Sequence, residues 1–144
     1  MNNSPQGQTT ILIVDDEPIA LEFCRSALTR AGYRVLTAAS ADEAVRWFEP
    51  GHSSIALALL DVVMPGTGGA ALAQRIVKLR PDTRIVLMSG YAPDEVKRLV
   101  GNDAAAYRSM WKPFEADTLV RMIRNVLGEP PGPPSATRAK RAIS

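Results

Sequence analysis

The chain has 144 residues, with 17 basic and 15 acidic side chains, a formal charge of +2 and a hydrophobic share of 46%. This apolar share is too high for a disordered chain, and the length suits one folded domain. The single cysteine, Cys24, excludes an internal disulfide. No apolar run approaches the roughly 20 residues of a membrane helix, and the polar start of the chain does not resemble a signal peptide, so we expect a cytoplasmic protein without membrane contact.

Short apolar runs alternate with amphipathic segments from residue 10 to residue 128. Strands are predicted at 11–14, 34–38, 55–60, 84–88 and, from a weaker pattern, 104–111. Three of these runs are almost continuously apolar, which is typical of central strands covered on both faces. Helices are predicted at 18–31, from the N-cap Ser40 through Phe48, at 69–79, 93–100 and 115–127. This alternation predicts an α/β fold, a parallel sheet with helices on both faces.

Both ends of the chain differ from this pattern. Residues 1–9 are polar and are expected to be disordered, whereas 10–128 form the folded domain. Residues 129–144 contain four prolines and carry the whole excess positive charge, so we expect a flexible basic tail with no further domain behind it. The folded part is electrically neutral, which argues against direct nucleic-acid binding.

Polar side chains stand where the predicted strands end. Asp15 and Asp16 follow the first strand, Asp61 the third, Ser89 the fourth and Lys112 the fifth. The carboxyl ends of parallel strands meet at one edge of a sheet, where ligands of such folds bind, so these residues are expected to converge. Acids before a helix can also serve only as caps, and a serine before glycine can be an ordinary turn residue. An acid that ends a six-residue apolar run is harder to explain structurally, and Asp61 is therefore the strongest candidate.

This set of residues suits one kind of chemistry. Clustered carboxylates repel one another unless an opposite charge holds them ionised, and Mg²⁺ accepts a few carboxylates together with phosphate oxygens. A carboxylate can attack phosphorus to give an acyl phosphate, and phosphoryl transfer is catalysed mainly by positioning and charge neutralisation. Mg²⁺ and Lys112 would neutralise charge, and Ser89 could bind a phosphoryl oxygen.

Four motifs in this order resemble the response-regulator receiver domains of bacterial two-component signalling, over roughly residues 9–128. They are Ile-Leu-Ile-Val-Asp-Asp-Glu-Pro at 11–18, Asp-Val-Val-Met-Pro-Gly at 61–66 with Gly69, Met-Ser-Gly-Tyr at 88–91 and Trp-Lys-Pro-Phe at 111–114. The resemblance implies a flavodoxin-like, doubly wound (βα)5 fold with strand order 2-1-3-4-5. The Ser-Gly-Tyr version is similar to receiver modules attached to hybrid histidine kinases.

The resemblance also implies roles. Asp61 would accept a phosphoryl group from a phosphohistidine of a sensor histidine kinase, while Asp15, Asp16, Asp61 and the backbone carbonyl of Val63 would hold Mg²⁺. Ser89 would take the position of the hydroxyl that moves toward the phosphate and Lys112 that of the ammonium, with a cis bond before Pro113. Such a protein is a self-modifying signalling phosphoacceptor, not an enzyme with a separate substrate.

One position departs from the family pattern. Ser109 stands where an aromatic switch residue is usual, and the period of two along a strand places Tyr107 and Trp111 on the same side, so either could replace it. The switching face, formed by the helix at 93–100, the fifth strand and the helix at 115–127, would bind a downstream protein, a histidine phosphotransfer partner or a second copy of the chain. Two alternatives remain: an aspartyl-phosphate phosphatase or phosphotransferase, and a binding module that is never phosphorylated.

Overall fold

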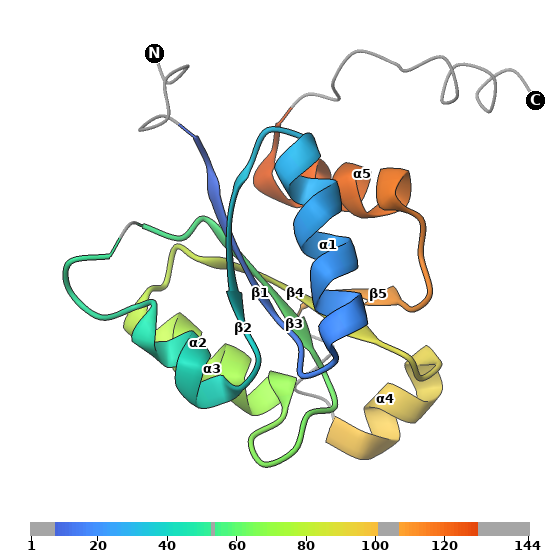
Figure 1. The fold of residues 1–144 in the computed structure, drawn as a ribbon. Coiled ribbons are helices and arrows are strands. Elements are labelled where there is room, and N and C mark those ends of the chain that lie inside the picture. Colours follow the sequence, from blue (N-terminus) through green and yellow to red (C-terminus); the bar gives the residue numbers. More distant parts are fainter. Residues whose placement is uncertain (1–7, 53, 101–106, 130–144) are drawn as a thin grey trace, which may run out of the picture.

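The computed structural model describes residues 8–52, 54–100 and 107–129, and within them five strands alternate with five helices (Figure 1). In chain order the elements are β1 (Thr10–Val14), α1 (Pro18–Arg30), β2 (Arg34–Ala38), α2 (Ala41–Arg46), β3 (Leu57–Asp61), α3 (Gly69–Leu79), β4 (Arg84–Ser89), α4 (Pro93–Val100), β5 (Arg108–Trp111) and α5 (Ala116–Leu127).

All five strands are parallel, in the order β2-β1-β3-β4-β5, so the predicted flavodoxin-like order is confirmed. The strand order changes direction at β1: β2 lies on one side of it, and β3, β4 and β5 follow on the other side. This is the switch point at which open α/β sheets form a crevice outside the strand ends.

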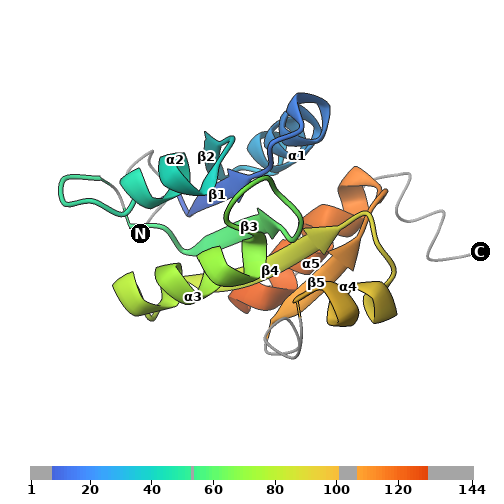
Figure 2. The ribbon, with the colours of Figure 1, turned by 90° about the horizontal axis from the view of Figure 1, so that it is seen from below.

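Helices cover the two faces of the sheet (Figures 1 and 2). α1 and α5 pack on one face and α2 and α3 on the other, while α4 lies near β5 in both views. Alternate residues of each strand enter opposite cores. One core contains Leu12, Leu60, Leu87, Leu72 and Ile76, and the other contains Ile13, Leu59, Met88, Leu28 and Leu119, all of them fully buried.

Local signals set the helix ends. The hydroxyl of Ser40 accepts a hydrogen bond from the Glu43 amide at 3.2 Å, and the Glu43 carboxylate accepts one from the Ala39 amide at 2.7 Å, so a cap of the predicted kind begins α2. α5 ends at Gly128, whose φ of 74° lies in the left-handed region that glycine adopts without strain.

Several predicted boundaries move. β3 begins at Leu57 rather than at Ile55, whose carbonyl accepts a hydrogen bond from the Thr83 hydroxyl at 2.7 Å instead of taking part in a strand ladder. β5 begins at Arg108, and the predicted strand residues 104–106 lie outside the described residues, as do 1–7 and 130–144. Glu129, the last described residue, accepts a hydrogen bond from the Tyr33 hydroxyl at 2.7 Å, and the limits of the two terminal segments stay predictions. In the part of the chain that is described, no helix combines the length and the apolar character needed to cross a membrane.

Candidate phosphoacceptor site

Three acidic residues lie side by side at the carboxyl ends of β1 and β3. These strands are neighbours in the sheet, with Val14 paired to Leu60, so the residues that follow come out together. One carboxylate oxygen from each of Asp15, Asp16 and Asp61 lies within 4.8 Å of the others. Asp15 and Asp61 are buried and Asp16 is exposed, which leaves the cluster open on one side.

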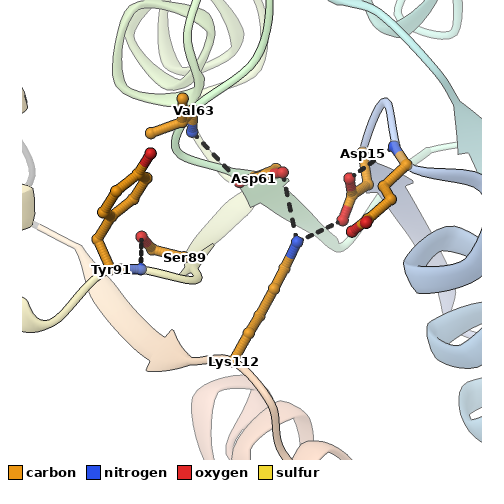
Figure 3. A network of polar contacts seen from close by, with 7 residues as sticks. Asp15, Asp61, Val63, Ser89, Tyr91 and Lys112 are labelled. Atoms are coloured by element: carbon orange, nitrogen blue, oxygen red, sulfur yellow. Dashed lines mark hydrogen bonds and ion pairs between the residues drawn. The ribbon is translucent and has the colours of Figure 1, made fainter.

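Lys112 reaches this cluster from the end of β5 (Figure 3). Its Nζ lies 2.8 Å from Asp15 Oδ2 and 3.3 Å from Asp61 Oδ2, so one ammonium bridges two carboxylates that are distant in sequence. The backbone around it is fixed, because the Lys112 amide donates to the Ser89 carbonyl at 2.7 Å and the predicted cis bond to Pro113 is present. The predicted convergence of the three aspartates and Lys112 at one edge of the sheet is thus confirmed.

The charges of this cluster change its protonation equilibria. Burial is the main cause that raises the pKa of Asp61 to about 6, with the nearby Asp15 carboxylate adding to the rise and Lys112 opposing it. The pKa of Lys112 is also raised: burial would lower it, but the hydrogen bond to Asp15 and the charges of both carboxylates outweigh that effect. Near neutral pH, Asp61 is therefore mostly ionised and faces a permanent positive charge.

Ser89 and Val63 complete the surroundings of Asp61 (Figure 3). Ser89 is buried at the end of β4, and its Oγ accepts a hydrogen bond from the Tyr91 amide at 2.9 Å, which leaves the hydroxyl proton as a donor. The Val63 amide donates to Asp61 Oδ1 at 3.2 Å. Tyr91, to which sequence reasoning gave no role, lies beside the site as part of the Ser-Gly-Tyr motif that marked Ser89.

The crevice above these groups has a volume of about 430 Å³ and is lined by Asp16, Glu17, Pro18, Asp61, Val63, Gly90, Tyr91 and Lys112. Its donor set consists of oxygen atoms with a net negative charge, which fits a hard divalent cation better than a soft metal. Carboxylates and an ammonium around one opening, with the buried Ser89 hydroxyl next to the lining residue Gly90, are groups that suit the binding and transfer of a phosphoryl group.

The three candidate switch residues lie on β5 or just before it, and none of them lines the crevice around Asp61. Ser109 pairs with Leu87, and with Trp111 it is exposed, whereas the alternate residue Met110 faces a core. Tyr107 is half-buried and packs against the core beneath α2 and α3. Trp111 has 59% of its surface exposed, so of the two aromatic candidates it has more freedom to change its environment.

An apolar surface near the site was not predicted. Ile19 and Phe23 of α1 are 82% and 41% exposed, and the rings of Phe23 and Phe114 lie 6.2 Å apart. Together with Lys112 these side chains line a second cavity of about 490 Å³. The signal was present in the sequence, because residues 19 and 23 are four apart and so share a helix face that differs from the buried face of Cys24 and Leu28.

Comparison with known proteins is consistent with this geometry. The model of the response regulator receiver domain family matches residues 11–124. The transcriptional regulator NtrC of Azospirillum brasilense is 34% identical over 130 residues, which are 90% of this chain and 26% of that protein. The sensor kinase CckA of Brucella abortus is 33% identical over 121 residues, 84% of this chain and 13% of that protein. The chain thus spans about a quarter or less of the length of these relatives.

Solved structures share the whole fold. The CheY-like receiver domain of Methanospirillum hungatei JF-1 has a TM-score of 0.73 and 31% identity, with 84% of this chain and 94% of that chain covered. The response regulator TrrA of Thermotoga maritima, in complex with Mg(2+)-BeF, has a TM-score of 0.71 and 31% identity, with 83% and 99% covered. Fold, site geometry and sequence agree, and the chain belongs to the response regulator receiver domain family, whose members are the phosphoacceptors of two-component signalling.

Proposed function

We propose that Asp61 accepts a phosphoryl group from the phosphohistidine of a sensor histidine kinase. The observation that carries this proposal is the Asp61 carboxylate, which lies 3.3 Å from the Lys112 ammonium and within 4.8 Å of two further carboxylates. In the step, an Asp61 oxygen forms a bond to phosphorus while the bond from phosphorus to the histidine nitrogen breaks, and the electron pair of that bond returns to the imidazole.

Asp15, Asp16, Asp61 and the backbone carbonyl of Val63 are the residues that would hold Mg²⁺. Their oxygen atoms fit this cation, and the relative TrrA was solved with Mg(2+)-BeF. When bound, Mg²⁺ neutralises charge on the transferred phosphoryl oxygens. Asp15 already shares the Lys112 ammonium with Asp61, so the three charged side chains act as one unit.

Lys112 and Ser89 would bind the phosphoryl group once it is on Asp61. The ammonium offers donors directly beside Asp61 Oδ2, and Ser89 can donate its hydroxyl proton to another phosphoryl oxygen. Attack of water on phosphorus would reverse the modification, because the bond from phosphorus to Asp61 breaks and the carboxylate is regenerated. Both reactions are catalysed by the chain itself.

Phosphorylation would then change what the protein binds. It adds negative charge beneath the Ser89–Tyr91 turn, and a partner can move the equilibrium only if it prefers one form of the surface. We assign this surface to α4, β5 and α5, with Trp111 or Tyr107 as the moving aromatic residue. A downstream protein, a histidine phosphotransfer partner or a second copy of the chain would read the change.

The apolar surface of Ile19, Phe23 and Phe114 would receive the phosphodonor. It continues directly from Lys112, and the phosphohistidine has to come within bonding distance of Asp61. An exposed isoleucine beside aromatic rings is suited to packing against the apolar side of a donor helix.

Incubation with Mg²⁺ and acetyl phosphate tests the proposal directly. The native protein should gain the mass of one phosphoryl group, and Asp61→Asn should gain none. Labelling of Asp61→Asn to the native level would place the phosphoryl group elsewhere. Continuous turnover of a small phosphomonoester would instead support the phosphatase alternative, and absence of labelling with every donor would support a binding module.

A further inference from the structure

Gly69, the first residue of α3, makes an unusually close backbone contact with the phosphoacceptor. A Cβ built on Gly69 would overlap the carbonyl oxygen of Asp61 and would lie 2.9 Å from its carbonyl carbon and 3.0 Å from the Cα of Val62. Real Cβ atoms essentially never come that close to backbone atoms, and these atoms cannot rotate away as a flexible side chain can. The contact therefore requires glycine for space, not for a special backbone angle.

Hydrogen bonds hold the backbone of Val62 from both sides. The Gly69 amide donates to the Val62 carbonyl at 2.9 Å, and the Val62 amide donates to the Met88 carbonyl of β4 at 2.8 Å. The Val62 side chain is buried as well. The segment that follows Asp61 is thus fixed between α3 and β4, and the Val63 amide, which binds Asp61 Oδ1, is next in the chain.

We propose that Gly69 is a positioning residue for phosphorylation, because the missing side chain lets α3 sit directly on the backbone of Asp61 and Val62. This inference rests on the proposed function of Asp61. A side chain at Gly69 would displace either the Asp61 carboxylate, which would form the bond to phosphorus, or the Val63 carbonyl, which would be an oxygen ligand of Mg²⁺. Both groups have to be in place for the reaction. A misplacement of about 1 Å can cost roughly a hundredfold in the rate of a reaction.

Gly69→Ala and Gly68→Ala form a graded test. A Cβ on Gly68 would lie 3.0 Å from the Val62 carbonyl oxygen, a tight contact that a small shift relieves. Intrinsic helix propensity favours alanine over glycine in α3, so propensity alone predicts no loss for Gly69→Ala. The proposal predicts a fall of roughly a hundredfold in the rate of labelling by acetyl phosphate for Gly69→Ala, and a smaller fall for Gly68→Ala.

Leu72→Ala is the control for stability, because Leu72 is fully buried in α3 without being part of the Asp61 contact. The Mg²⁺ concentration that gives half-maximal labelling should rise in both glycine variants and stay unchanged in Leu72→Ala. The amide resonances of Asp61, Val62 and Val63 should likewise shift more in the glycine variants than in Leu72→Ala. If Gly69→Ala does not fold, Gly68→Ala decides the question by the same measurements.

The proposal is overturned if the glycine variants match Leu72→Ala in labelling rate, in Mg²⁺ dependence and in these resonances. Failure of the native protein to accept a phosphoryl group would remove the proposed function instead. In that case the resonance shifts of the unlabelled variants still decide whether Gly69 positions the Asp61 backbone.

Discussion

At the scale of single residues, Asp61 combines a reactive position with a cost to the folded state. Its pKa, raised to about 6 from the 3.8 of an unperturbed carboxyl, means that the fold disfavours the ionised form. The nucleophile of the proposed reaction is that ionised form. A site that gains reactivity in this way gives up some stability, which leads to two predictions.

Asp61→Asn should be more stable than the native protein at pH 8, on the order of 1–2 kcal/mol in the free energy of unfolding. At that pH the native carboxylate is ionised in both states, so the folded state bears the cost of burial and of repulsion from Asp15. As the pH falls through 6 toward 4, the folded carboxyl becomes protonated and the difference disappears. Urea unfolding at a series of pH values measures it, and Asp16→Asn, at an exposed position, should change stability by less than about 0.5 kcal/mol.

The rate of phosphorylation by acetyl phosphate should fall as the pH drops below about 6, because only the ionised Asp61 attacks phosphorus. Raising the Mg²⁺ concentration should move the midpoint to lower pH, since a cation beside the carboxylate favours its ionised form. Initial rates of intact-mass labelling between pH 5 and pH 8 provide the profile. A midpoint that is independent of Mg²⁺ would show that the titrating group lies outside the cation site.

At the scale of elements, strand ends were more predictable than helix surfaces. An acid after an unbroken apolar run, as in Leu60-Asp61, predicts both a buried strand and the residue at which that strand ends. The exposed position of Ile19 was not predicted: residues 19 and 23 visibly share a helix face, but α1 carries apolar residues on more than one face, and periodicity does not say which face stays open. The closeness of Gly69 to Asp61 depends on where α3 packs, which no local pattern contains.

The exposed face of α1 should affect the rate of phosphoryl transfer from a protein donor but not the rate of labelling by a small donor such as acetyl phosphate. Ile19→Ala is expected to slow transfer from a phosphorylated histidine kinase about tenfold. The isoleucine side chain would be buried against the donor in the complex, and alanine loses most of that apolar contact. Labelling by acetyl phosphate should stay at the native rate, because Ile19 is 82% exposed and is not one of the residues that line the crevice around Asp61. Equal slowing with both donors would show that the substitution disturbs the site itself.

Trp111 at the end of β5 should report the switch. Addition of beryllofluoride with Mg²⁺ is expected to change tryptophan emission, since Trp111 pairs with Ser89 in the sheet and is 59% exposed. The other tryptophan, Trp47, donates to the Thr37 carbonyl on β2 and lines neither the crevice around Asp61 nor the cavity beside Lys112. The change should therefore persist in Trp47→Phe and vanish in Trp111→Phe, and an unchanged spectrum in Trp47→Phe would favour Tyr107.

At the scale of the whole molecule, the site exists only when the sheet is complete. Asp15, Asp61 and Lys112 come from strands β1, β3 and β5 and are separated by up to 97 positions in the chain. The alternation of strands and helices predicted a parallel sheet covered on both faces, whereas the order of its strands was predicted from the resemblance to receiver domains. Any ligand of the cluster binds the folded chain and not the unfolded one, so binding and folding are linked.

This linkage predicts that beryllofluoride with Mg²⁺ stabilises the entire domain. At a free concentration one hundred times the dissociation constant, the free energy of unfolding should rise by roughly 2.7 kcal/mol, seen as a higher midpoint in thermal unfolding. Asp61→Asn removes the oxygen to which the phosphoryl mimic attaches and should show no such rise beyond the effect of Mg²⁺ alone. Asp16→Asn keeps Asp61 and weakens only the proposed cation site, so its midpoint should rise to the full extent once more Mg²⁺ is supplied. A rise of equal size in Asp61→Asn would mean that the mimic binds away from the strand ends, and the assignment of Asp61 would then be wrong.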